Sequence, residues 1–204
     1  MAHAYSTDST ERRLIPFFVA ATAIGSAFLA SHFFHRYQIN LPWWASPPID
    51  TMAFYGFYYW LLDRHIWKLS FVHWLRITRI PNLSGVWHGQ VHPTETKGVS
   101  AGLGTVIDIT ISIHQTWTEL SILGRTKLSK SHSLSGSLIV KEECSISYEY
   151  VNEPLAPAAD TMHSHRGTAR LSINEASGTL EGDYYSGRDR QNIGTIRLKR
   201  ARSG

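Results

Sequence analysis

Residues 107–115 read IDITISIHQ, and this stretch decides how the second half of the chain folds. Isoleucine occupies every second position from Ile107 to Ile113, with polar residues between them. Successive side chains of a β-strand point to opposite sides, so this alternation predicts a strand with one buried face. The same row continues to Gln115 and Trp117, so the buried face ends in an amide and an indole.

Further stretches with a period of two lie on both sides of this strand. They are LSGVWHGQV (83–91), SISYEYV (145–151), HRGTARLSI (165–173) and GTIRLKR (194–200). Turn residues rich in glycine separate these stretches, and no convincing helical period follows residue 80. About eight short strands at regular spacing predict an all-β antiparallel barrel, with a sandwich as the alternative. A barrel of this size has room for side chains or for one small ligand.

Strand parity also predicts which side chains face the inside of the barrel. Each inward row begins aliphatic and ends aromatic or polar, so we expect one packed end and one end with a cavity for a small molecule. The residues expected at the cavity end are Gln115, Trp117, Tyr148, Tyr150, Asn152, His165 and Tyr184. Arg188 and Arg190 are expected to reach over its mouth. Strand aromatics are also ordinary core residues, and bulges break parity, so a filled barrel is the alternative.

The first third of the chain has the composition of a membrane region. Residues 14–34 contain no Asp, Glu, Lys or Arg, and this length matches the hydrocarbon thickness of a bilayer. We expect a transmembrane helix over about 14–34, because the run is long for a cleaved signal peptide and no typical cleavage site follows it. We therefore expect the membrane region in residues 1–79 and the ligand-binding barrel in residues 80–204.

A second apolar stretch, rich in aromatic residues, predicts another transmembrane helix over about 43–62. A re-entrant or surface helix is the alternative, because Pro47, Pro48 and Asp50 lie near its start. Residues 63–79 are expected to form an amphipathic linker on the membrane surface. Close contact between helices is expected at small residues of the first helix, Ala21 and Gly25, and also Ala23, Ala27 and Ser31.

Basic residues predict the orientation of this multi-pass region in the inner membrane. The connecting loop has one, Arg36, whereas the outer flanks carry Arg12, Arg13, Arg64, Lys68, Arg76 and Arg79. The positive-inside rule therefore puts the N-terminus and the barrel in the cytoplasm. The single cysteine, Cys144, suits a reducing compartment.

Charge and motifs also exclude some functions. The net charge is +4, but residues 80–204 carry 13 Lys or Arg and 12 Asp or Glu, so a nucleic-acid polymer is not an expected partner. The pair His163 and His165 has no acidic ligand at a matching spacing, and no G-x-S-x-G or phosphate-binding glycine loop is found. We therefore expect no catalytic residues, no metal and no cofactor.

Several short blocks, taken in order, connect the chain with a known family. They are NLSGVWHG, SIHQTW, SKSHS, YEYVNEP, HRGT and LEGDYYSGRDRQNIGTIRL, preceded by the two hydrophobic stretches. The chain resembles the two-transmembrane, β-barrel effector of bacterial CBASS cyclic-oligonucleotide anti-phage systems. This resemblance implies a receptor that binds a cyclic dinucleotide made by a partner nucleotidyltransferase. It also implies that the effector assembles in the inner membrane and disrupts it, so that the infected cell dies.

The expected site residues suit the chemistry of such a ligand. Aromatic faces for the two bases would come from Trp117, Tyr148, Tyr150 and Tyr184. Amide groups for the base edges would come from Gln115 and Asn152, and a planar cation for the phosphates from Arg188 or Arg190. Ser129, Ser131 and Ser133 either add phosphate contacts or form a solvated strand face. Three alternatives are a membrane-tethered sensor or carrier of another ligand, a scaffold with a filled barrel, and a membrane-bound hydrolase.

Overall fold

The computed structural model describes residues 2–39, 47–94, 106–141, 143–156, 163–174, 176–187 and 192–201. The chain forms two compact units. Residues 9–79 make up a helical unit, and Met1–Asp8 together with Ile80–Gly204 make up a β-barrel unit.

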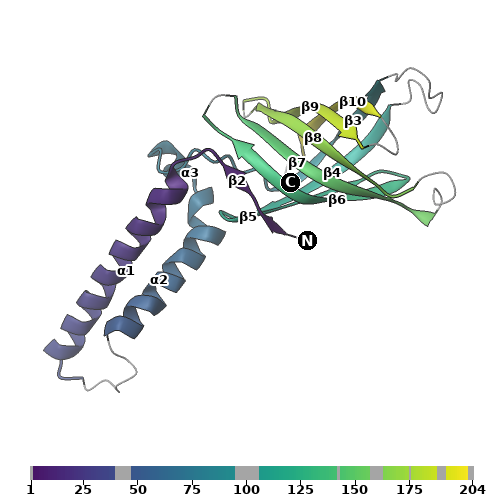
Figure 1. Cartoon of the computed structure of the whole chain (residues 1–204). Helices are drawn as coiled ribbons and strands as arrows, with labels where there is room; N and C mark the ends of the chain where they lie inside the picture. Colours follow the sequence, from purple (N-terminus) through teal and green to yellow (C-terminus); the bar gives the residue numbers. More distant parts are fainter. Residues whose placement is uncertain are drawn as a thin grey trace. The chain divides into compact units, whose positions relative to one another are not determined.

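The helical unit contains two long helices, α1 (Glu11–Arg36) and α2 (Pro47–Arg64), shown in Figure 1. A 3-10 turn, η1 (Ile66–Lys68), and a short helix, α3 (Ser70–Trp74), follow within the predicted linker. Within the described residues, α1 is the one helix long and apolar enough to span a membrane, and it contains the predicted span of 14–34. The second predicted span overlaps α2, except for residues 43–46, which lie outside the described residues.

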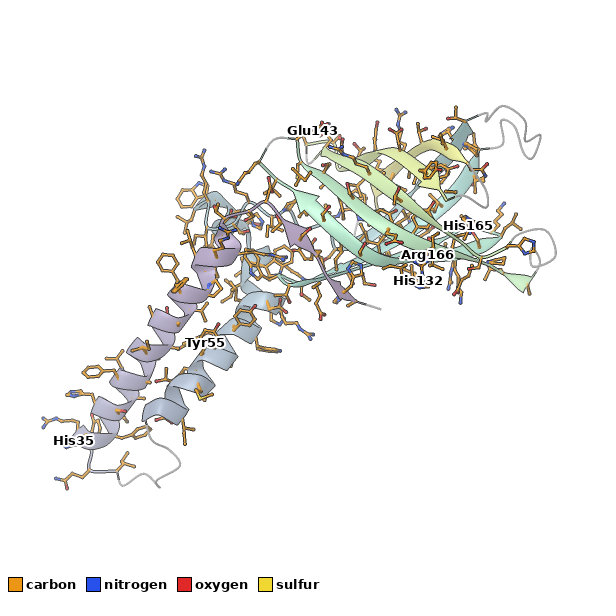
Figure 2. All side chains as sticks on the ribbon, viewed as in Figure 1. His35, Tyr55, His132, Glu143, His165 and Arg166 are labelled. Carbon is orange, nitrogen blue, oxygen red and sulfur yellow. The ribbon has the colours of Figure 1, made fainter. Side chains whose placement is uncertain are left out.

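Helices α1 and α2 pack against each other through small residues of α1. Ala23 and Ala27 are buried, and the hydroxyl of Ser26 on the same face forms a 2.9 Å hydrogen bond with the Tyr58 hydroxyl of α2. The remaining surface of α1 exposes large apolar side chains, among them Phe17, Phe18 and Phe28. Figure 2 shows the side chains along both helices, with His35 near the end of α1 and Tyr55 on α2. Exposed phenylalanines of this kind suit contact with lipid.

The barrel consists of eight long strands in an up-and-down arrangement (Figure 1). Their bounds are β3 (Gly85–Thr94), β4 (Ile107–Gln115), β5 (Glu119–Arg125), β6 (Ser129–Ile139), β7 (Ser145–Pro154), β8 (His165–Asn174), β9 (Thr179–Ser186) and β10 (Ile193–Arg200). Each strand pairs antiparallel with the next, and β10 pairs with β3 to close the ring. The predicted antiparallel barrel of about eight strands is confirmed.

Two very short strands were not predicted. β1 (His3–Ala4) pairs antiparallel with β5, and β2 (Ser6–Thr7) pairs parallel with β6. The structure therefore adds residues 3–8, the N-terminal arm, to the barrel unit, although the sequence analysis had assigned them to the membrane region. Two-residue strands are too short to show a period, so alternation could not reveal them.

One end of the barrel is filled with large side chains. Trp87, Trp117 and Leu120 are at most 3% exposed there. The guanidinium of Arg200 lies 5.0 Å from the ring centroid of Trp87 and donates hydrogen bonds to the carbonyl oxygens of Asn82 and Ser84. We call this filled end the closed end of the barrel and the opposite end the open end.

Candidate ligand-binding site

A cavity of about 470 Å³ lies inside the barrel and is lined by residues of β3–β10 and of the turn between β5 and β6. Its volume falls in the range of small-molecule sites. The two sides of the cavity differ in chemistry. The β3, β4 and β10 side is aliphatic, with Val91, Ile107, Ile109, Ile111 and Ile196, whereas β6–β9 supply the polar and aromatic groups Ser129, Ser131, Tyr148, Tyr150, Asn152, His165, Tyr184 and Ser186.

The register of the strands brings five of the predicted residues together. Asn152 of β7 is opposite His165 of β8, and Tyr148 of β7 shares its partner Ala169 with Tyr184 of β9. The parity prediction therefore placed Tyr148, Tyr150, Asn152, His165 and Tyr184 on the correct face and at the same end of the barrel. Figure 2 marks His165 at the start of β8.

Two glycines make room for the aromatic rings of this wall. A methyl group on Gly167 would come within 2.5 Å of the ring and hydroxyl of Tyr150. A methyl group on Gly194 would come within 2.6 Å of the Tyr184 ring. Real side chains do not approach so closely, so each ring lies directly over a glycine of the neighbouring strand. Glycine at these positions sets where the rings lie in the cavity.

Tyr148 and Tyr150 form a pair in the wall of the cavity, with ring centroids 6.1 Å apart and an interplanar angle of 52°. Burial, and to a smaller extent the neighbouring Tyr150, raise the pKa of Tyr148 well above its ordinary value. The Tyr148 hydroxyl therefore keeps its proton at neutral pH, and the pair brings aromatic surface without negative charge.

His165 is a buried polar residue whose ring is held by a hydrogen bond to the backbone. Its Nδ1 lies 3.0 Å from the carbonyl oxygen of His163, which can only accept a hydrogen bond. Nδ1 therefore carries a proton in this arrangement. The side chain is 8% exposed and lines the cavity.

The serine row of β6 divides between two roles. Ser129 and Ser131 line the cavity. Ser133 does not, because its hydroxyl accepts a hydrogen bond from the backbone N–H of Ile122 at 3.0 Å and is also bonded to His3. Ser186 and Asn192 line the cavity as well but were not predicted. Ser186 has the same parity as Tyr184, so extension of that row by one step would have found it.

Gln115 and Trp117 do not lie at the cavity, and their predicted place with the other site residues is wrong. Both are at the closed end, at most 2% exposed. Gln115 Oε1 accepts the Leu83 N–H at 2.8 Å, and its Nε2 donates to the Tyr5 hydroxyl at 3.4 Å. Parity identifies the face of a strand but not which end is the mouth. Because β4 enters from the mouth, its row runs from the cavity at Ile107 to the closed end at Gln115.

Few charged groups surround the mouth of the cavity. Lys127, exposed in the turn between β5 and β6, and Asp108 are the charged residues among the described part of its lining. Arg188 and Arg190 lie outside the described residues. Within the ranges that the structure covers, no group of three or more His, Cys, Asp or Glu residues is placed to hold a metal ion.

A closed antiparallel barrel with a cavity that is half aliphatic and half aromatic and polar is the architecture of a small-ligand-binding β-barrel. In this chain such a barrel is joined to an apolar helix of membrane-spanning length. The class is therefore that of membrane-associated, ligand-binding barrel proteins.

Comparison with known proteins identifies the family. Residues 78–200 match the family described as "Cap15, cyclic dinucleotide receptor domain", and residues 13–68 match "Cap15, TM helices". The chain belongs to the Cap15 family. It is similar to CD-NTase-associated protein 15 from Yersinia aleksiciae, with 28% identity over 192 residues that cover 92% of this chain and 88% of that protein. The family resemblance predicted from the short sequence blocks is confirmed.

Proposed function

We propose that this chain is a membrane-anchored effector of CBASS anti-phage defence whose barrel binds a cyclic dinucleotide made by a partner nucleotidyltransferase. Binding causes homo-oligomerisation, disruption of the inner membrane and death of the infected cell. The chain acts as a receptor and not as an enzyme. The observation that carries the proposal is the cavity wall formed by Tyr148, Tyr150, Asn152, His165 and Tyr184, in a barrel of a receptor family.

The chemistry of the wall supports this ligand class. A cyclic dinucleotide has two flat bases, and the rings of Tyr148, Tyr150 and Tyr184 present aromatic surface on which bases stack. The Asn152 amide and the His165 ring suit the polar edges of a base. Lys127 at the mouth, with Arg188 and Arg190, would supply cations for the two phosphates.

Two adjacent tyrosines of β9 provide a matched test of ligand binding. Tyr184 lines the cavity, whereas Tyr185 is 48% exposed on the other face of the strand. In calorimetry of the full-length protein in detergent against a panel of cyclic dinucleotides, Tyr184→Ala should weaken binding about 5- to 150-fold, the value of one base stack. Tyr185→Ala should bind as the parent does. Equal affinity of the two variants would contradict the proposed site.

A second matched pair tests the phosphate contacts. Lys127 lies at the cavity mouth, whereas Lys130 is held 3.0 Å from Glu153 in an ion pair and does not line the cavity. Lys127→Ala, Arg188→Ala and Arg190→Ala should weaken binding of the cyclic dinucleotide and reduce its dependence on salt. Lys130→Ala should change neither. Equal affinity in all four variants would show that Lys127, Arg188 and Arg190 do not hold the phosphates of the ligand.

The path of the chain supports two membrane crossings. The N-terminal arm belongs to the barrel unit, and the chain returns to that unit at Ile80. A segment that leaves and re-enters one folded unit on one side of a bilayer crosses it an even number of times. We therefore assign the second crossing to α2 and place the N-terminus and barrel in the cytoplasm, in agreement with the basic flanks.

Cysteine labelling tests this topology. In a Cys144→Ala background, a membrane-impermeant maleimide added to intact spheroplasts should label His35→Cys, at the end of α1, and spare Ser177→Cys on the barrel. Both positions are exposed in the structure, so accessibility within the protein does not limit either reaction. Labelling of Ser177→Cys in intact spheroplasts would place the barrel outside the cytoplasm.

Self-association in the membrane is assigned to the exposed small residues of α1. Ala23 and Ala27 are buried by packing within the unit, but Ala21 and Gly25 are exposed, and a methyl group on Gly25 would meet nothing within 4 Å. Gly25→Leu therefore leaves the fold of one chain intact and obstructs only close contact with another copy. It should abolish toxicity and keep ligand affinity, whereas Thr22→Leu, outside the Ala21–Gly25 row, should remain toxic. Toxicity of Gly25→Leu would show that this row is not a contact between copies.

The aliphatic side of the cavity favours a second candidate, a membrane-tethered sensor or carrier of another, more apolar ligand. Ile107, Ile109 and Ile111 offer a surface that an anionic ligand does not require. The calorimetric panel should therefore include a fatty acid and a lysophospholipid. Binding of these ligands in place of every cyclic dinucleotide would favour the second candidate.

A further inference from the structure

The ring of eight strands contains an opening along part of one strand pair. β5 and β6 pair directly only at Leu123, Gly124 and Arg125, which oppose His132, Ser131 and Lys130. The register of β6 against β7 shifts between Ser133 and Ser135, which marks a bulge just past the last residue of β6 that pairs with β5. Residues 119–122 of β5 and 133–139 of β6 therefore have no ladder to each other. We call this opening the seam.

The N-terminal arm fills the seam and pairs with both of its edges. His3 and Ala4 pair with Leu120 and Glu119 of β5, and Ser6 and Thr7 pair with Ser137 and Leu138 of β6. The arm thus supplies the backbone partners that β5 and β6 do not supply to each other.

Side chains make the seam specific for this segment. Tyr5 is 3% exposed, and its hydroxyl lies 3.4 Å from the Gln115 amide. Asp8 accepts hydrogen bonds from the backbone N–H groups of Val140 and Lys141 at 2.9 and 3.2 Å. The ring of His3 lies beside Gly136 and forms a 2.8 Å hydrogen bond with the Ser133 hydroxyl where the two strands part.

We propose that the seam is an interface between copies of this chain, in which the N-terminal arm of one copy occupies the seam of another. The inference rests on the homo-oligomer of the proposed function and identifies a contact that joins its barrels. A second copy carries the same Tyr5, Asp8 and His3 and so fits the seam as well as the chain's own arm does. If each copy gives its arm to the next, the contact is head-to-tail and extends beyond a dimer.

The cost of this exchange is low for two reasons. The arm is held by four paired residues, far fewer than in a barrel strand, and an arm that leaves its own seam forms the same pairs and hydrogen bonds in the seam of the next copy. Only Ser9 and Thr10 separate Asp8 from the first residue of α1, and short hinges of this kind are places where a segment is exchanged between copies. Anchoring in one membrane raises the local concentration of copies, which favours exchange further.

Disulfide trapping in native membranes tests the exchange. Ala4 and Glu119 are exposed and directly opposite in the antiparallel pair, so cysteines at these positions are placed to form a disulfide. Two differently tagged full-length chains with Cys144→Ala are co-expressed, one with Ala4→Cys and the other with Glu119→Cys. Exchange predicts a disulfide-linked pair of the two chains in several-fold excess over a collision control, Ser177→Cys with Glu119→Cys. The yield should fall when a long Gly-Ser linker is inserted between Ser9 and Thr10.

Native gel electrophoresis of the same membranes separates the possible results. Assemblies without a cross-link above the collision control would overturn arm exchange and leave the proposed function intact. Absence of any assembly in the presence of a bound cyclic dinucleotide would overturn both. A double variant with Ala4→Cys and Glu119→Cys in the same chain shows whose seam the arm occupies. If disulfides form only within single chains, even in assemblies, this result also contradicts exchange.

Discussion

The closed and open ends of the barrel are made from the same eight strands, yet one is filled and the other is hollow. At the closed end, Trp117 is buried together with leucine and isoleucine from the strands, among them Leu120, Leu138, Ile146, Leu171, Leu180 and Leu198. At the open end, the residues beside the tyrosine rings are Gly167, Ala169 and Gly194. Both ends carry aromatic side chains. A cavity remains at the open end because glycine and alanine lie beside the aromatic rings there. The size of the residues next to the rings therefore decides which end of the barrel is hollow.

The polar side chains of the closed end and of the open end also differ in their surroundings. The Gln115 amide at the closed end is bonded to Leu83 and Tyr5, so its oxygen and nitrogen both have partners inside the protein. The Asn152 amide and the His165 ring at the open end lie in the lining of the cavity, where a ligand can reach them. Loss of a side chain should therefore reduce mainly stability at the closed end and mainly ligand affinity at the open end.

Trp117→Ala should have the largest effect on stability. The indole is 2% exposed, and its removal leaves a cavity among side chains that cannot collapse to fill it. The free energy of unfolding should fall by about 3–5 kcal/mol. Denaturation of the full-length protein in detergent measures this change, with Tyr185→Ala on the outer surface as a control expected within about 0.5 kcal/mol. A Trp117→Ala protein as stable as the control would mean that the closed end is not a packed core.

Gln115→Met should have the next largest effect. Methionine keeps the volume but removes the acceptor of the Leu83 N–H and a partner of Tyr5. A buried donor without a partner costs about 1–3 kcal/mol, and the same unfolding experiment should show a loss of this size. Gln90→Met is a suitable control, because Gln90 is exposed, is not in the cavity lining, and forms a solvent-exposed hydrogen bond. If Gln115→Met instead kept its stability and lost ligand affinity, Gln115 would act at the site, as the sequence first suggested.

Gln115 shows how far sequence reasoning reaches in this chain. Alternation along residues 107–115 was sufficient to predict the strand, its buried face and, with similar stretches, the antiparallel barrel. It could not predict which end of the inward row opens, because that depends on residues of neighbouring strands and hence on the register. Gly167 and Gly194 carry this information, but a glycine in a strand has no sequence signal for the ring that lies over it.

The N-terminal arm marks a second limit of the sequence. Its pairing depends on the limited ladder between β5 and β6, next to the bulge in β6, and neither a bulge nor a two-residue strand produces a period. By contrast, the apolar run of α1 is a local property, and the sequence located it within the observed helix.

Tyr150→Ala at the open end should reduce ligand affinity more than stability, unlike the substitutions at the closed end. The ring lies over Gly167 and is half-buried at the cavity, so its loss should cost about 1 kcal/mol of stability. Affinity for the cyclic dinucleotide should fall more strongly, by about 5- to 150-fold, if a base stacks on the ring. Calorimetry and denaturation on the same preparation give both values. A large loss of stability with unchanged affinity would make Tyr150 a core residue and weaken the contrast between the ends.

Gly124→Ala should have the smallest effect on stability and tests whether the hollow itself matters. A methyl group here would meet the Ser131 hydroxyl, which can rotate away, and would lie 3.7 Å from Ile109 Cδ1, an ordinary contact. The free energy of unfolding should therefore change by no more than about 0.5 kcal/mol. The methyl group nevertheless occupies space in the cavity wall and displaces a polar group, so ligand affinity should fall.

The double variant Gly124→Ala with Ser131→Ala separates these two causes. If affinity falls because the Ser131 hydroxyl is displaced, the methyl group should have no further effect once that hydroxyl is absent. If affinity falls because the cavity is smaller, the two losses should add. Unchanged affinity in both variants would show that the ligand does not reach this side of the cavity, and would confine the binding surface to the strands that carry the tyrosines.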